Sequence, residues 1–122
     1  MRILAFFVLA IVASGCSKSG PTLAGGKPID HWIQALNDPN PNVRKTAATK
    51  LGNVGPTDPA ALPALQTALN DRDGTVRCEV ILALVKFGPA AKEAVPALAE
   101  MRQRDVDAKV RDYAAKALAK LE

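Results

Sequence analysis

The sequence predicts an all-α fold, an α-solenoid of about three helical hairpins. The main observation is a motif that occurs three times: an aspartate, followed six residues later by an arginine that a valine directly precedes. The arginines lie 33 and then 34 residues apart, a period typical of stacked supersecondary units. Such stacks form extended binding faces rather than enclosed active sites. The three pairs are Asp38 and Arg44, Asp71 and Arg77, and Asp105 and Arg111.

Composition sets limits on size and partner class. The chain has 122 residues, enough for one modest domain, and its 48% apolar and 23% charged residues are ordinary for a globular protein. Aromatic residues make up only 4%, and abundant alanine suits closely packed helices. The net charge of +4 is mild, and few aromatic residues are present to stack on bases. We therefore expect no nucleic-acid partner.

The first residues differ from the rest of the chain. Arg2 gives a positive start, Ile3 to Val12 is an unbroken apolar run, and small residues follow. This pattern predicts a secretory signal peptide over residues 1–15, with an apolar run too short for a mature membrane span. The small residues end at Cys16, an arrangement that resembles the lipobox of bacterial lipoproteins.

The lipobox resemblance implies that Cys16 is lipidated and becomes the mature N-terminus. The protein would then be exported and anchored in the cell membrane or the outer membrane, facing the periplasm or the cell exterior. Ala13 stands where the lipobox usually has Leu, so the alternative is an ordinary cleaved signal peptide with a chance cysteine. Residues 16–27 are rich in Gly, Ser and Lys, which predicts a flexible tether.

Residues 28–122 are expected to form the folded domain. Apolar residues recur at helical spacing, and Gly55-Pro56 and Gly88-Pro89 predict where two helices end. Pro63 and Pro96 lie near the starts of helices, where a proline costs no hydrogen bond. A helix that began earlier would instead be bent at Pro63. The predicted units cover about residues 28–55, 56–88 and 89–122.

These features together resemble HEAT repeats, most closely the short bacterial type known as phycobilisome-lyase-like HEAT repeats. The resemblance covers about Pro28 to Glu122. It implies a ladder in which each arginine bonds aspartates of its own and adjacent repeats. Carried over, Asp38, Asp71 and Asp105 would pair with Arg44, Arg77 and Arg111. In the third unit Arg102 stands where the second has Leu69, so looser inner packing is expected there.

No catalytic set, metal site or cofactor site is predicted. Identical ion pairs at a structural period indicate inter-repeat bonding, because an enzyme needs unlike groups that converge on one point. His31 is the only histidine and has no set of ligand companions, so a surface or partly buried position is expected. Trp32 is interpreted as a core residue that covers the N-terminal end of the stack, the alternative being a ligand-stacking role.

The second helix of each unit normally lines the concave face of such a solenoid. The central unit is apolar at positions where its neighbours are polar, which predicts a partner site inside a polar rim. The alternative, which we weigh equally, is that Cys78 and Leu82 pack against an adjacent helix. With Cys16 lipidated, Cys78 would be a free thiol, packed or paired with a partner. The predicted partner face consists of Lys45, Thr49, Cys78, Leu82, Val85, Asp112 and Lys116.

The favoured function is therefore a non-catalytic protein-interaction or scaffold module, tethered to the cell envelope, whose protein partner the sequence does not identify. A lyase-like or pigment-binding accessory protein is an alternative taken from the family resemblance. A nucleic-acid-binding solenoid is a weaker one.

Overall fold

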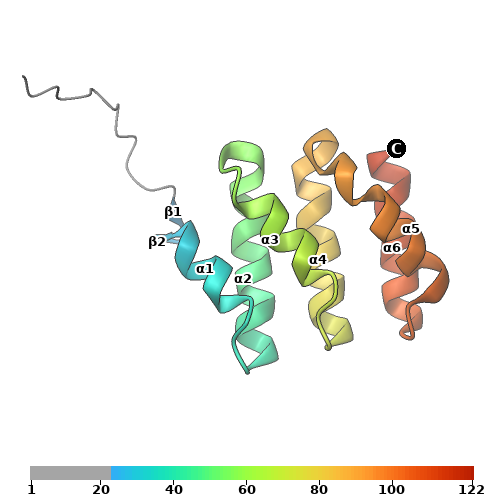
Figure 1. The fold of residues 1–122 in the computed structure, drawn as a ribbon, viewed down its shortest axis with the longest axis horizontal. Helices are drawn as coiled ribbons and strands as arrows, with labels where there is room; N and C mark the ends of the chain where they lie inside the picture. The colour runs from blue at the N-terminus through green and yellow to red at the C-terminus, as the bar shows by residue number, and fades with distance from the viewer. Residues whose placement is uncertain (1–22) are drawn as a thin grey trace, which may run out of the picture.

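The computed structural model describes residues 23–122, which form six α-helices in three antiparallel pairs (Figure 1). The prediction of an all-α solenoid is confirmed. The predicted signal peptide and Cys16 lie outside the described residues. No helix in the described part of the chain is long and apolar enough to cross a membrane.

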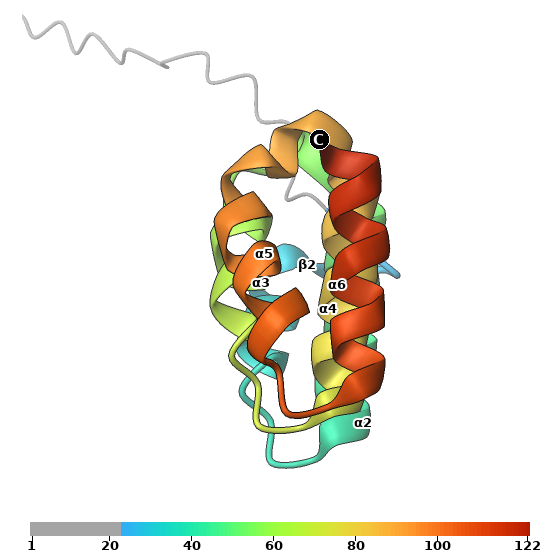
Figure 2. The same cartoon turned by 90° about the vertical axis from the view of Figure 1, so that its right-hand side faces the viewer.

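The helices form two layers, seen edge-on in Figure 2. One layer holds the first helix of each pair and the other holds the second. The first helices are α1 (Ile29–Ala35), α3 (Ala61–Ala68) and α5 (Val95–Arg104). The second helices are α2 (Pro41–Val54), α4 (Gly74–Phe87) and α6 (Ala108–Leu121). The 3₁₀ segments η1 (Gly55–Thr57) and η2 (Gly88–Ala94) connect successive pairs.

Side-chain caps and glycines set the limits of the second helices. Asn40, Asp73 and Asp107 each accept a hydrogen bond from a backbone N–H of the first turn. Gly55 and Gly88 end α2 and α4 with φ of 63° and 60°, values that favour glycine. Helix α3 begins at Ala61, so Pro63 lies in its first turn rather than at a bend.

The core lies between the two layers. Leu51, Leu84 and Leu118 occupy equivalent places in the three second helices, and all three are buried. Leu65 and Leu98 face them from the first-helix layer and are fully buried. Burial of one such side chain contributes about 2 kcal/mol, so this recurring layer supplies much of the stability of the stack.

In the third unit a longer first helix absorbs the extra residue. Helix α5 has 10 residues, whereas α3 has 8. Arg102, at the place expected to hold a core leucine, is exposed, and Met101 beside it is half-buried. The core position Leu98 is nevertheless fully buried.

Residues 23–28 belong to the folded domain, which corrects the expectation that residues 16–27 are all tether. Strands β1 (Leu23–Ala24) and β2 (Lys27–Pro28) form a small antiparallel hairpin. Gly25 and Gly26 have positive φ and make its turn. The Trp32 Nε1–H donates to the Ala24 carbonyl at 2.6 Å, and both residues are buried. The hairpin therefore covers the N-terminal end of the stack.

Candidate protein-interaction site

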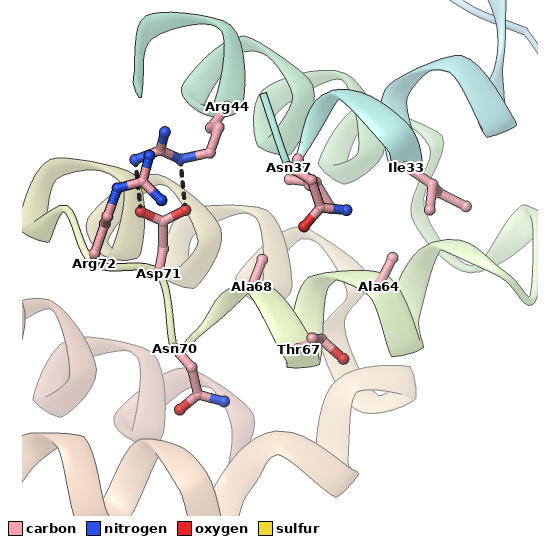
Figure 3. A pocket seen from close by; sticks show the side chains of 10 residues that line it. Ile33, Asn37, Arg44, Ala64, Thr67, Ala68, Asn70, Asp71 and Arg72 are labelled. Carbon is pink, nitrogen blue, oxygen red and sulfur yellow. Dashed lines mark hydrogen bonds and ion pairs between the residues drawn. The ribbon is translucent and has the colours of Figure 1, made fainter. Parts of the chain in front are cut away.

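The repeated arginines and aspartates connect adjacent units. Arg44 donates through Nε and Nη2 to the two carboxylate oxygens of Asp71, at 2.8 and 3.1 Å (Figure 3). Its Nη1 donates to the backbone carbonyls of Asp38 and Pro39, at 2.8 and 3.0 Å. The Arg44 and Asp71 side chains are only 3% and 8% exposed. A planar guanidinium can satisfy both sets of acceptors at once.

The next unit has the same arrangement. Arg77 donates to both carboxylate oxygens of Asp105 at 2.9 Å, and to the Asp71 carbonyl at 2.8 Å. Burial alone would raise the pKa of Asp105, but the hydrogen bonds from Arg77 and the Asp107 amide lower that pKa overall.

The arginine–aspartate ion pairs connect neighbouring units and do not form within a unit. Arg44 and Arg77 each meet their own unit's aspartate only at the backbone carbonyl, and the carboxylate that they bind belongs to the following unit. The Asp38 carboxylate accepts from the Asn40 amide instead, at 2.8 Å. Arg111 donates to the Asp105 carbonyl at 2.6 Å. Arg44 and Arg77 thus each make several hydrogen bonds to internal acceptors, which fits a structural role.

Two grooves in the first-helix layer recur with the repeat. One, of about 510 Å³, lies between α1 and α3 and includes Arg44 and Asp71; Figure 3 shows Arg72 beside this pair. The other, of about 430 Å³, lies between α3 and α5 and includes Arg77 and Asp105. Both grooves contain an internally paired arginine and aspartate, and both recur at the same place in successive repeats. We therefore assign a binding role to neither groove.

On the second-helix layer, polar bridges close the seam between α2 and α4. Thr49 donates to a carboxylate oxygen of Glu79 at 2.9 Å, and to the Lys45 carbonyl at 3.1 Å. Lys86 donates to the Asn53 side-chain oxygen at 2.7 Å. Thr49, a residue of the predicted partner face, thus belongs to this polar seam, whereas Lys45 contributes only its backbone carbonyl.

Cys78 does not belong to the surface. Its side chain is 7% exposed, and burial raises the pKa of its thiol. A buried thiol with a raised pKa is a poor nucleophile, which argues against covalent attachment of a pigment. For Cys78 the packed alternative is correct, whereas Leu82, 41% exposed, lies on the surface.

Leu82 and Val85 lie in an open groove between α4 and α6, of about 490 Å³, which we call the α4/α6 groove. Lys116 lines its other side, from α6. Asp112 forms an ion pair with Lys116 at 2.9 Å. The complete lining is Ile81, Leu82, Val85, Tyr113, Lys116, Ala117, Ala119 and Lys120.

The α2/α4 and α4/α6 seams differ in the residue at the position of Gly52. In α2, Gly52 packs so tightly against α4 that an added Cβ would lie 2.7 Å from the Ala83 Cβ. The residue of α4 that is equivalent to Gly52 is Val85, and the equivalent of Ala83 is Ala117. A valine cannot approach an alanine as closely as a glycine does. Val85 and Ala117 both line the α4/α6 groove.

The polar bridges are also missing from the second seam. The positions of Thr49 and Glu79 are taken by Leu82 and Tyr113, which cannot form that hydrogen bond. The α4/α6 groove therefore has an apolar floor where the α2/α4 seam has a polar bridge. Tyr113 and Lys120 are absent from the predicted face. An alignment of the three second helices could have identified both residues, because it pairs Tyr113 with Glu79 and Lys120 with Lys86.

Metal-ligand side chains, His31 and Trp32 were also considered from the sequence. Residues 23–122 contain no group of three or more His, Cys, Asp or Glu side chains that could hold a metal ion. His31 is exposed, and its ring meets the edge of Trp32 at a centroid distance of 4.7 Å. Trp32 is buried beneath the hairpin, as expected for a core residue.

Comparison with known proteins identifies the family. A family model described as HEAT repeats matches residues 29–119, so the chain belongs to the HEAT-repeat family. HEAT repeats generally mediate protein interaction or scaffolding, and the family is typically non-catalytic. A search of curated proteins finds no match.

Proposed function

We propose that this protein is a non-catalytic interaction module of the cell envelope that binds a protein partner through the α4/α6 groove. The observation that carries the proposal is the contrast between the two seams of the second-helix layer. Thr49 and Glu79 bridge one seam at 2.9 Å, whereas the other exposes Leu82 beside Tyr113 and Val85. An apolar groove with a polar rim is the usual form of a protein-binding site.

The N-terminal sequence supports a location at a membrane surface. The apolar run before Cys16 has the form of an export signal, and lipidation of Cys16 would supply the anchor. Six residues, 17–22, connect Cys16 to strand β1. Six residues span at most about 20 Å, so the module would work close to the bilayer.

Site-specific photo-crosslinking in cells of the source organism tests the proposed groove. A benzoylphenylalanine placed at Leu82 should yield a discrete protein adduct, which the additional substitution Tyr113→Glu should abolish. The matched control is the same probe at Val106, which is 92% exposed but lies in the loop before α6. Equal adducts from both positions, or none from Leu82, would contradict the proposal.

The envelope tether has its own test. Metabolic labelling with an alkyne fatty acid should label the protein, and the substitution Cys16→Ser should remove the label. An unlabelled protein that is still cleaved and exported would indicate an ordinary signal peptide instead.

A further inference from the structure

We propose that the α4/α6 groove binds an acidic amphipathic helix of a protein partner, with an apolar anchor and a carboxylate about one turn apart. This inference rests on the proposed function, since it specifies the chemistry of the partner. It depends on two halves of the groove, one apolar and one basic.

The apolar half is formed by Leu82, Val85 and Tyr113. Leu82 is one of three large apolar side chains of residues 23–122 that are clearly exposed, and it is the one of the three that lies on a helix, where it lines the α4/α6 groove. Ala117 and Ala119 keep the α6 side of the groove shallow. An inserted leucine, methionine or phenylalanine would remove these apolar surfaces from water, which favours binding.

The basic half is formed by Lys116 and Lys120. Lys120 is equivalent to Lys86, whose ammonium group has an acceptor in Asn53 at 2.7 Å. For Lys120 the corresponding acceptor position is Lys86 itself, a second cation that already bonds to Asn53. Within residues 23–122, Lys120 forms no hydrogen bond or ion pair. It is therefore available to an external carboxylate.

Lys116 can also change partner at little cost. Its ion pair with Asp112 has side chains that are 72% and 58% exposed. Solvent screens such a pair, which makes only a small contribution to stability. A carboxylate that enters the groove would gain two ammonium groups one turn apart on α6.

The spacing of these groups favours a helical ligand. Leu82 to Val85 and Lys116 to Lys120 each cover about one turn, or about 5 to 6 Å along the axis. A bound helix presents residues three and four apart on one face, so it can place an apolar side chain on Leu82 and a carboxylate near Lys120.

A membrane surface fits the groove less well. The apolar residues line a hollow between two helices, whereas insertion into a bilayer requires side chains that project outwards. The shape of the groove thus favours a protein segment.

Fluorescence polarisation with the full chain tests the inference. The probe is a fluorescein-labelled alanine-based helical peptide with one leucine and glutamates three and four residues after it. A second peptide has lysines in place of the glutamates. The glutamate peptide should bind at least about tenfold more tightly than the lysine peptide, because the charges complement Lys116 and Lys120. Lys120→Glu should lower affinity for the glutamate peptide about fivefold and raise it for the lysine peptide, whereas Lys120→Arg should preserve it.

Matched controls keep the result interpretable. Leu82→Ser should lower the affinity for the glutamate peptide about tenfold. Val106→Ser and Lys92→Glu, at exposed positions outside the α4/α6 groove, should leave that affinity unchanged. Circular dichroism checks that each variant remains folded. Equal binding of both peptides, or binding that Leu82→Ser leaves intact, would overturn the inference.

Two further outcomes separate the acidic helix from other occupants. The first uses sedimentation of the Cys16→Ser chain with phosphatidylglycerol vesicles. If the chain sediments with the vesicles, Lys120→Glu abolishes this sedimentation and the peptides do not bind, the groove binds lipid and the inference is overturned. A protein adduct from Leu82 in cells, combined with no charge preference among the peptides, would refute the acidic helix alone. Absence of that adduct would refute the proposed function itself.

Discussion

Gly52 lies directly against Ala83 across the seam between α2 and α4, so closely that a Cβ on Gly52 would lie 2.7 Å from the Ala83 Cβ and 2.8 Å from its Cα. The equivalent pair in the next seam is Val85 and Ala117, beside the α4/α6 groove. Gly52 thus allows close packing of the α2/α4 seam, where Thr49 and Glu79 also form a polar bridge. This relationship connects packing to the proposed binding site.

Gly52→Ala should lower the free energy of unfolding. Forcing the two helices apart costs about 1 to 3 kcal/mol, and the better helix propensity of alanine returns up to about 1 kcal/mol. We expect a net loss of about 1 to 2 kcal/mol, measured by urea denaturation. Ala83→Gly in the same chain should restore part of the loss, because it removes the clash between the two methyl groups but leaves the new methyl group close to the backbone of α4. A Gly52→Ala variant as stable as the parent would show that this seam is not tightly packed.

Asp105→Ala should destabilise the stack by about 3 kcal/mol, because it leaves the Arg77 guanidinium and the Asp107 amide without acceptors in a mostly buried position. The matched measurement is a double-mutant cycle with Arg77→Leu. The double variant should be more stable than the sum of the two single losses predicts, since it removes both members of the pair. Strict additivity would mean that the two side chains are not energetically coupled.

Stability should decrease in acid, in part because of Asp105. Its pKa is lowered in the folded state from an ordinary value of 3.8, through the bonds that outweigh burial. The folded carboxylate therefore binds protons less readily than the unfolded one. Its contribution is fully present above pH 3.8 and is lost as the pH falls through the lowered folded pKa. Asp105→Asn should reduce the decrease of the free energy of unfolding between neutral and acidic pH, measured by urea titrations at several pH values. An unchanged pH dependence would exclude Asp105 as its source.

Trp32→Phe should release the N-terminal hairpin, because phenylalanine cannot donate to the Ala24 carbonyl. We expect a loss of about 1 to 2 kcal/mol and faster hydrogen exchange at the hairpin amides. Exchange in α6, at the other end of the stack, provides the internal control. If α1 stays fully protected in a chain that lacks Leu23–Pro28, the hairpin does not cover this end.

The repeat and its helices could be predicted from sequence because their signals are local. Apolar spacing, the first-turn Pro63 and the terminal Gly55 each act within a few residues, and all three correspond to the observed helix limits. The hairpin could not be predicted in the same way. Its short strands carry little pattern, and they are held by contact with Trp32, whose partner the local sequence does not identify.

The candidate site was only partly predictable for a related reason. Leu82 stood out because it is apolar where Thr49 and Lys116 are polar. Cys78 is also apolar, yet it is buried. Two residues on the same face of a helix can differ in exposure, because a neighbouring helix can cover one and not the other. Tyr113 and Lys120 gain their roles only from what lies opposite them on α4.

The central claim is that the α4/α6 groove binds the partner because it lacks the polar closure of the neighbouring seam. The most direct test converts one seam into the other with Leu82→Thr and Tyr113→Glu, which recreate the pair formed by Thr49 and Glu79. The probe is a benzoylphenylalanine at Ala119, a groove residue that the conversion leaves in place. We predict that the converted chain unfolds at a similar urea concentration but loses the partner adduct obtained from Ala119. Undiminished crosslinking in a stably folded converted chain would contradict the account.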